Sequence, residues 1–242
     1  MKICVISDVH SNLVALEAVL ADVPEVDALV NAGDIVGYNP WPAECVEAMQ
    51  SPAKSPLVPD HLATAIQRSP TPGASGVPTV RGNHDQAVVK NAPFRFNQMA
   101  KAGVEHALGE LNDLHTTWLS SLPTEWSLFD DRLKVVHGHP DDPNQYTYPD
   151  DFEPSLLGDE DVLVMGHTHV QHHEVYDEGI VMNPGSVGQP RDGDPRAAYA
   201  VVDLKDLTVE ERRVEYDIER VQQAVSSAGL PAKIGSRLAD GQ

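Results

Sequence analysis

The chain has little positive charge. Only 17 of its 242 residues are Lys or Arg, against 37 Asp or Glu, and the formal net charge is -20. A protein this acidic repels phosphate backbones and anionic lipid headgroups, so extended nucleic acid and membrane surfaces are poor choices of partner. Any anionic substrate needs a local positive centre. The acidic excess favours a surface adapted to high salt, with a mesophilic acidic protein as the alternative.

Long apolar runs and cysteines are also scarce. No stretch approaches the roughly 20 apolar residues of a membrane span, and the apolar run before Asp8 is too brief for a signal peptide. The two cysteines are Cys4, in that run, and Cys45, in a predicted helix, so buried free thiols are expected rather than a disulfide or a zinc site. With 41% hydrophobic residues the chain can bury a core, and we expect a cytoplasmic globular protein.

Strand and helix patterns alternate in the first part of the chain. Residues 2–7 and 27–32 are predicted strands, and residues 12–23 and 42–49 are predicted helices, which is typical of a largely parallel sheet. Residues 51–76 carry five prolines and are predicted to form a surface insertion with a short helix at 60–67.

Later segments predict a strand at 77–81 and a helical region at 85–121, broken near 92–93 and 112–113. Short strands separated by turns follow and predict a second, mixed or antiparallel sheet. These strands lie at 126–129, 133–137, 162–165, 172–176, 180–183, 197–204 and 208–216. A last helix and a tail occupy 217–242, and we expect residues 1–242 to form a single domain.

Five polar clusters follow predicted strands at their C-terminal ends, where open α/β sheets place ligand sites. Each cluster alone is a weak signal, because a single His or Asp after a strand is usually solvated or caps a turn. In extended backbone, however, an i, i+2 pair projects both side chains from one face, so such a pair can hold one metal or bridge two. The clusters are Asp8-Val9-His10, Gly33-Asp34, Gly82-Asn83-His84-Asp85, His137-Gly138 and Gly166-His167-Thr168-His169.

Together the clusters offer two carboxylates, one amide oxygen and four imidazoles, a donor set suited to Mn, Fe, Zn, Ni or Co. Seven ligands are too many for one ion. Two ions about 3.5–4 Å apart that share a carboxylate and a water form an arrangement used for attack at phosphorus. The glycines before Asp34, Asn83 and His167 allow tight backbone turns beneath such ions.

In this order the clusters resemble the motifs of the calcineurin-like metallophosphoesterase superfamily, over about residues 1–204. Residues 181–203 resemble its small prokaryotic branch. The resemblance implies an α/β fold, a four-layer α/β/β/α sandwich of two mixed sheets flanked by helices. It also implies two divalent ions, with Mn as first choice and Fe, Zn, Ni, Co or Mg as alternatives. The implied ligands are Asp8, His10 and His169 for the first ion, Asn83, His137 and His167 for the second, and Asp34 for both.

The implied function is hydrolysis of phosphodiesters or phosphomonoesters, with small nucleotide-type substrates, by attack of a metal-bridging hydroxide. His84 would stabilise charge on the phosphate or protonate the leaving oxygen. A small phosphorylated substrate is the expected partner, and the oligomeric state is open. The alternatives are a protein or dinucleoside-polyphosphate phosphatase, or a protein-binding scaffold of the same fold.

Three further residues are candidates for a role beside the predicted ligands. Asp85 is a candidate catalytic residue that orients His84 or Asn83, or else a helix cap. Arg191 and Arg81 are candidate substrate-binding cations; Arg191 could instead form a surface salt bridge. In the protein Ser/Thr phosphatase branch an acid pairs with the motif histidine. Here the Gly33-Asp34 cluster continues Ile-Val-Gly-Tyr-Asn, so that acid is missing, which disfavours a dedicated protein phosphatase.

Overall fold

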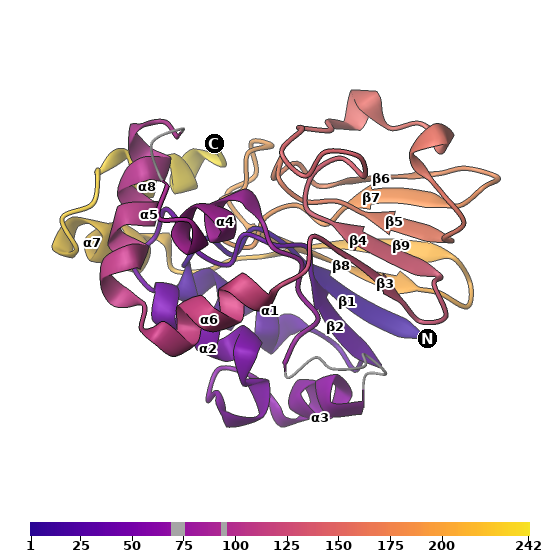
Figure 1. Ribbon diagram of the computed structural model, residues 1–242, viewed down its shortest axis with the longest axis horizontal. Coiled ribbons are helices and arrows are strands. Elements are labelled where there is room, and N and C mark those ends of the chain that lie inside the picture. Colours follow the sequence, from indigo (N-terminus) through magenta and orange to yellow (C-terminus); the bar gives the residue numbers. More distant parts are fainter. Residues whose placement is uncertain (69–75, 93–95) are drawn as a thin grey trace.

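The computed structural model of the protein describes residues 1–68, 76–92 and 96–242. Two β-sheets pack face to face, and most of the helices gather on one side of them (Figure 1). The first sheet has the order β2-β1-β8-β9 and the second β3-β4-β5-β7-β6. The strands are β1 (Lys2–Ile6), β2 (Ala28–Asn31), β3 (Glu125–Leu128), β4 (Leu133–Val136), β5 (Val162–Val164), β6 (His172–Val175), β7 (Ile180–Asn183), β8 (Ala197–Asp203) and β9 (Thr208–Val214).

Both sheets are mixed. In the first, β1 runs parallel to β2 and antiparallel to β8, with Ile3 beside Ala28 on one side and beside Val202 on the other. The expectation of a largely parallel first sheet was therefore wrong, as was the assignment of 197–204 and 208–216 to the second sheet. The alternation of apolar residues identifies a strand but not its neighbour. Residues 77–81 form a single bridge, Asn31 to Thr79, instead of the predicted strand.

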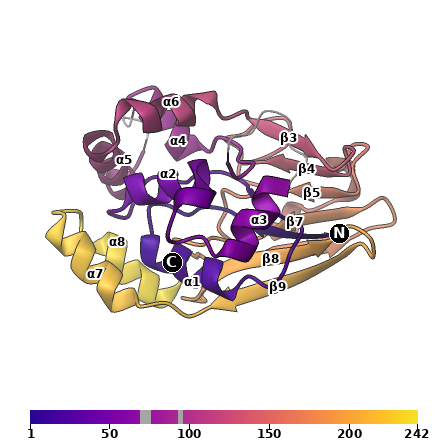
Figure 2. The ribbon, with the colours of Figure 1, turned by 90° about the horizontal axis from the view of Figure 1, so that it is seen from below.

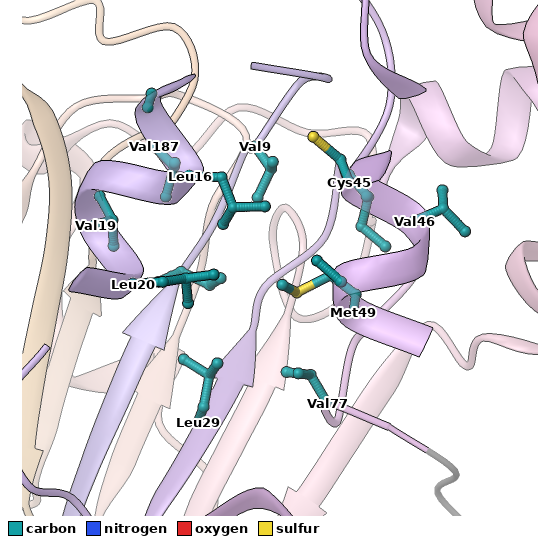
Figure 3. Packing of buried hydrophobic residues seen from close by; sticks show 14 of the residues in the cluster. Val9, Leu16, Val19, Leu20, Leu29, Cys45, Val46, Met49, Val77 and Val187 are labelled. Carbon is teal, nitrogen blue, oxygen red and sulfur yellow. The ribbon is translucent and has the colours of Figure 1, made fainter. Parts of the chain in front are cut away.

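Alternation along β1 divides the core into two parts. Ile3 and Val5 face the second sheet, whereas Cys4 and Ile6 face the helices, because successive side chains leave opposite faces of a strand. Cys4 and Cys45 are both buried and free, as expected. In Figure 3 side chains from two helices converge over Leu29 of β2. These helices are α1 (Leu13–Asp22) and α2 (Pro42–Gln50).

The C-terminal segment packs against the same body. Helix α7 (Ile218–Ser227) begins at Asp217, whose side chain accepts a hydrogen bond from the Arg220 backbone as an N-cap. It is followed by α8 (Lys233–Ser236) and a short 3-10 helix, η5 (Arg237–Asp240). Figure 2 shows α7 and α8 beside α1, and their apolar residues form a cluster with Val14 and Tyr38.

The described part of segment 51–76 lies at the surface with one face of its helix buried in the core, and its assignment as an insertion stays a prediction. It contains η1 (Pro52–Lys54) and α3 (Asp60–Arg68), a helix that the sequence placed correctly. Leu62 and Ile66 of α3 are buried in the cluster that contains Leu29. Three apolar positions on one helical face, Leu62, Ala65 and Ile66, are buried despite the flanking prolines. Residues 69–75, which include two of the prolines, lie outside the described residues.

Three helices follow in the second quarter of the chain: α4 (Asn83–Val89), α5 (Gln98–Glu110) and α6 (Asp113–Ser121). The predicted break near 112–113 is confirmed, since Asn112 caps α6. Helix α4 ends at Val89, and the predicted break near 92–93 falls partly on residues 93–95, which lie outside the described residues. The outer face of the second sheet is covered by 3-10 helices η3 (Pro149–Asp151) and η4 (Pro154–Leu156) with their neighbours. Among the described residues, no helix is both long and apolar enough to cross a membrane.

Candidate metal centre

The seven predicted ligands come together at one edge of the molecule, where strands of both sheets end. Within each sheet the relevant strands are parallel, β1 with β2 and β4 with β5, so their C-terminal ends share an edge. The seven side chains are Asp8 and His10 after β1, Asp34 after β2, Asn83 at the start of α4, His137 after β4, and His167 and His169 after β5.

Asp8, His10 and His169 form one group, which we call the first ligand group. Oδ1 of Asp8 lies 3.2 Å from Nε2 of His169 and 3.6 Å from Nε2 of His10. The two Nε2 atoms are 3.1 Å apart. All three side chains are buried, at 0 to 2% exposure. The first sheet supplies two of them and the second sheet the third, so the centre joins the two sheets.

Asn83, His137 and His167 form the second ligand group. Oδ1 of Asn83 lies 3.1 Å from Nε2 of His137, and the rings of His137 and His167 are 4.9 Å apart between centroids. The candidate ligand atoms of His137 and His167 and one oxygen of Asp34 all lie within 4.8 Å of one another. His137 is completely buried, whereas Asn83 is half-buried.

Asp34 lies between the two groups. Its Oδ2 is 3.7 Å from Nε2 of His10 and 3.4 Å from Nε2 of His137. Its Oδ1 accepts a hydrogen bond of 2.8 Å from the backbone N–H of His84, which fixes the orientation of the carboxylate. One oxygen is therefore directed at both groups at once.

Hydrogen bonds to backbone carbonyls set the protonation of the histidine rings. His10, His137 and His169 each place Nδ1 against a carbonyl oxygen, at 3.1, 2.8 and 2.6 Å. A carbonyl can only accept, so each ring donates from Nδ1 and presents Nε2 to the centre. His167 is the reverse: Nε2 lies 3.3 Å from the Asn144 carbonyl, which leaves Nδ1 as its ligand atom.

The first ligand group needs a cation to be satisfied. Oδ2 of Asp8 accepts hydrogen bonds from Ser7 and from the His167 backbone, but its Oδ1 is buried without a hydrogen-bond partner. This oxygen faces two imidazole nitrogens that also present lone pairs. Three acceptors converging in a buried site repel one another unless a cation lies among them. A carboxylate with imidazoles is a donor set that suits divalent transition metals.

Four of the five shifted pKa values among the predicted ligands fit the same assignment, and that of His137 does not. Burial raises the pKa of Asp8 and Asp34, but the neighbouring histidines outweigh it and hold both carboxyl pKa values well below their usual range. Burial lowers the pKa of His169 to about 3 and that of His167 to about 4. For His137 burial also lowers the pKa, but Asp34 outweighs it and raises the value to about 10. A cation bound at His137 has to displace that proton.

Five of the seven ligands have left-handed backbone, with φ between 47° and 68°. The extended geometry expected for the Asp8/His10 and His167/His169 pairs was therefore wrong. Each pair lies in a turn, and the two histidines of the second pair go to different ligand groups. Such conformations cost about 1–3 kcal/mol each in non-glycine residues and concentrate at functional sites. The five residues are Asp8, His10, Asp34, His167 and His169.

Glycines let the loops approach closely, as expected. A Cβ added at Gly82 would lie 2.0 Å from Oδ1 of Asp34, and one at Gly166 would lie 2.1 Å from Oγ of Ser7. A larger residue at either position would displace the carboxylates that complete the centre.

His84 lies beside the centre and is 4% exposed. Its ring contacts those of His10, Tyr38 and Phe96, with centroids 4.6 to 4.8 Å apart. Burial lowers its pKa well below the usual value, although Asp34 opposes the shift. Nδ1 of His84 is buried without a hydrogen-bond partner among the described residues, and a Cβ added at Gly37 would lie 2.3 Å from it. Glycine thus stands where a polarising side chain would reach.

Asp85 contacts backbone rather than the other site residues. Its Oδ1 accepts hydrogen bonds from the N–H groups of Ile35 and Val36, and its Oδ2 from that of Gly82. Burial and the charge of Asp34 raise its pKa to about 7. These contacts fit the cap interpretation, because they join the loop after Asp34 to the start of α4, and they include no bond to the side chains of His84 or Asn83.

The two arginines lie on different sides of the centre. Arg191 donates from Nη2 to the hydroxyl of Tyr38 and to Oε1 of Gln189. Burial of His169 is the main cause of its low pKa, and the positive charge of Arg191 lowers that pKa further. Arg191 forms no salt bridge among the described residues. Arg81 donates from Nη1 to the Ser120 carbonyl and lines a cavity that also includes Asn83.

No pattern in the sequence singled out Tyr146, Asn144 or Tyr38. Tyr146 stacks on His167, with ring centroids 3.9 Å apart and planes inclined by 24°. Asn144, in the same loop, accepts from Nε2 of His167 through its carbonyl oxygen. The loop follows the His137-Gly138 cluster, but its composition does not distinguish it from an ordinary polar loop. The Tyr146 ring and the Asn144 carbonyl therefore support the His167 ring on its outer side.

Two mixed sheets that meet at an edge lined by this ligand set define a metal-dependent phosphoesterase, a hydrolase of phosphate esters. The chain belongs to the calcineurin-like phosphoesterase superfamily, because the sequence model of that domain matches residues 1–207. Membership of this superfamily implies that the protein binds divalent metal ions.

Similar proteins cover nearly the whole chain. The chain is 31% identical to the phosphodiesterase YfcE of Escherichia coli over 212 residues, 86% of this chain and 91% of the relative. It is 32% identical to an uncharacterized protein of Methanocaldococcus jannaschii over 98% of this chain and 96% of that protein. A metallophosphoesterase structure from Sphaerobacter thermophilus matches with a TM-score of 0.75, 35% identity and full coverage of both chains. A hypothetical protein of Pyrococcus horikoshii shares the fold, with a TM-score of 0.81 at 22% identity over 100% of this chain and 98% of that one.

Proposed function

We propose that the protein hydrolyses phosphodiesters or phosphomonoesters of small, nucleotide-type substrates with two divalent ions, Mn²⁺ being the first choice. The first ligand group would hold one ion, the second would hold the other, and Asp34 would contact both. The observation that carries the proposal is the position of Oδ2 of Asp34, 3.7 Å from His10 on one side and 3.4 Å from His137 on the other. A carboxylate placed between two donor sets is the arrangement of a two-metal site.

When bound, the ions would neutralise phosphate oxygens and lower the pKa of the attacking water. The protein's own contribution is to hold the donors in place. Asp85 is a positioning residue in this proposal, because its carboxylate joins the backbone after Asp34 to the start of α4. The backbone N–H of His84 then orients Asp34 itself.

His84 would act on the substrate. Its low pKa keeps the ring neutral, and its buried Nδ1 leaves Nε2 to meet the phosphate. From there a neutral imidazole N–H can donate to a developing negative charge on a phosphoryl oxygen or to the leaving oxygen. Arg191, anchored by Tyr38 and Gln189, would add a positive charge on the side of the first ligand group.

The other functions have less support. A scaffold has no use for seven converging ligands, five of them in costly backbone conformations. A dedicated protein phosphatase of the expected kind needs an acid beside the motif histidine, and Gly37 lies there instead.

The test measures bound metal and turnover together. Purified protein is loaded with Mn²⁺, its metal content is determined by mass spectrometry, and hydrolysis of bis-p-nitrophenyl phosphate is followed. We expect two ions per chain and turnover in the natural protein, and loss of both ions and of activity in Asp34→Asn. His84→Ala should keep both ions and slow turnover about 100-fold or more, the scale of general acid–base contributions.

Asp206→Asn is the matched control, since it makes the same chemical change at an exposed residue outside the centre. Natural protein that binds fewer than two ions and cleaves no phosphate ester would overturn the proposal. Activity of Asp34→Asn equal to that of Asp206→Asn would overturn the role of Asp34.

A further inference from the structure

A cavity of about 530 Å³ opens beside the second ligand group. Its lining includes Asn83, one of the predicted ligands, and Asn144, whose carbonyl oxygen contacts His167. Phe96 also lines it, and the same ring lies 4.6 Å from that of His84. The cavity therefore borders the second ligand group and includes a ring that packs against His84.

The described lining of this cavity is positively charged, although the chain as a whole is acidic. Its described lining contains two cations, Arg81 and Lys90, and no carboxylate, in a chain with 37 acidic and 17 basic residues. Three other surface cavities each include at least one carboxylate, such as Glu219, Asp203 or Glu153.

Neither cation is neutralised by the protein. Among the residues that the structure describes, Arg81 and Lys90 form no salt bridge, whereas seven other Lys and Arg side chains do. Arg81 is half-buried, bonds through Nη1 to a backbone carbonyl, and has a buried Nε without a partner. Lys90 is exposed at the end of α4. The remaining wall mixes donors, Gln86 and Thr124, with the apolar side chains of Ala87 and Phe96.

We propose that this cavity, which we call the second-phosphate subsite, binds another phosphate carried by the substrate. The proposal rests on the proposed function, because it places the scissile phosphate at the metal centre and the rest of the substrate in the cavity. Arg81 and Lys90 would supply the charge, Gln86 would add a hydrogen-bond donor, and the Phe96 wall would accept an apolar or planar linking group. The preferred substrates are then phosphate esters with a second phosphate a short distance away.

The test compares two ligands that differ by one phosphate. Thymidine 5′-phosphate and thymidine 3′,5′-bisphosphate are titrated into the Mn²⁺-loaded protein by calorimetry at low ionic strength. We expect the bisphosphate to bind about 30-fold more tightly, about tenfold from half-buried Arg81 and about threefold from exposed Lys90. Arg81→Gln and Lys90→Gln should each remove their share of the preference, and the double variant should bind both ligands about equally.

Lys54→Gln is the control, because Lys54 is an exposed lysine in η1 that is not part of the cavity lining. It should keep the full preference. Thermal melts of each variant show whether the fold is kept. Turnover of the p-nitrophenyl ester of thymidine 5′-phosphate, with and without a 3′-phosphate, gives the same comparison as a ratio of kcat/KM.

Equal binding of the two nucleotides by the natural protein would overturn the subsite, as would a preference that the double variant retains. The proposed function can fail separately. If the protein holds no ions and cleaves neither ester, calorimetry without metal should still show a phosphate of either nucleotide binding at the subsite, and the double variant should lose that binding, because neither cation is a candidate ligand.

Discussion

The two ligand groups lie on either side of Asp34 but differ in what holds them. Asp8, His10 and His169 are 0 to 2% exposed, and their partners are Ser7 and backbone carbonyls of the buried loops. The second group borders the second-phosphate subsite and depends on an exposed loop. Tyr146, which stacks on His167, is 47% exposed, and Asn83 is half-buried.

This difference in burial predicts that the first ligand group is the more rigid of the two and the second the more adaptable. Buried partners fix ligand orientation and raise affinity, whereas elements with few buried contacts open more easily. We therefore expect the first ligand group to bind its ion more tightly and the second to exchange its ion and meet the substrate. Four variants test this difference between the two groups in ion affinity and exchange.

Removing a ligand from the rigid group should have the largest effect. His169→Ala leaves Asp8 and His10 without their third partner, so we expect loss of the tighter ion and a fall in kcat/KM of about a thousand-fold, because a bound ion contributes several kcal/mol to the transition state. Metal titration followed by mass spectrometry checks the stoichiometry. His172→Ala, at a half-buried position in β6 outside both ligand groups, is the matched control. Retention of the tighter ion in His169→Ala would reverse the ranking of the two groups.

Removing a ligand from the adaptable group should cost one ion and leave the other. Asn83→Ala is expected to bind a single Mn²⁺ with the affinity of the tighter natural site and to lose most of its turnover. The remaining ion should still stabilise the fold, by about 2.7 kcal/mol at a free concentration 100 times its Kd. Melting temperatures with and without EDTA measure this. Loss of both ions in Asn83→Ala would show that the groups do not bind independently.

The sequence predicted which side chains gather at the sheet edge better than it predicted the surroundings that hold them. The five clusters could be read because each spans only a few residues, and four of them come directly after a strand. The pairing of β8 with β1 joins residues about 200 positions apart, such as Lys2 and Asp203, and no local pattern reports such a partner. The left-handed backbone of Asp8 and His10 was missed for a related reason, since their loops are fixed by hydrogen bonds to Gly33 and Asp34.

Contacts made by backbone atoms also could not be predicted from the sequence. Asn144 contacts His167 through its carbonyl oxygen, a group that every residue has, so its identity gives no signal. Asp85 had two interpretations because position at a helix start is compatible with both, and its contacts distinguish them. The metal identity and adaptation to high salt stay predictions.

The exposed loop can be tested through Tyr146. Tyr146→Ala removes the ring from the outer face of His167, so the second ion should bind about tenfold more weakly, the lower range for residues that support a ligand. Tyr146→Phe keeps the ring and should keep the affinity, which separates stacking from any role of the hydroxyl. The first ion should be unaffected in both, as measured by calorimetry with Mn²⁺. Equal weakening of both ions by Tyr146→Ala would contradict the separate support of the two groups.

The smallest effect should come from removing the Ser7 hydroxyl, which supports Asp8 of the first ligand group. Ser7→Ala removes the 2.7 Å hydrogen bond to Oδ2 of Asp8, but the backbone N–H of His167 still bonds to the same oxygen at 3.0 Å. Because one donor remains, we expect a stability loss of about 1 kcal/mol by urea unfolding and only a few-fold loss of affinity for the first ion. Ser127→Ala, at an exposed strand position, is the control. If Ser7→Ala weakens its ion more than Tyr146→Ala weakens the other, then a side chain, and not the buried backbone, holds the first ligand group.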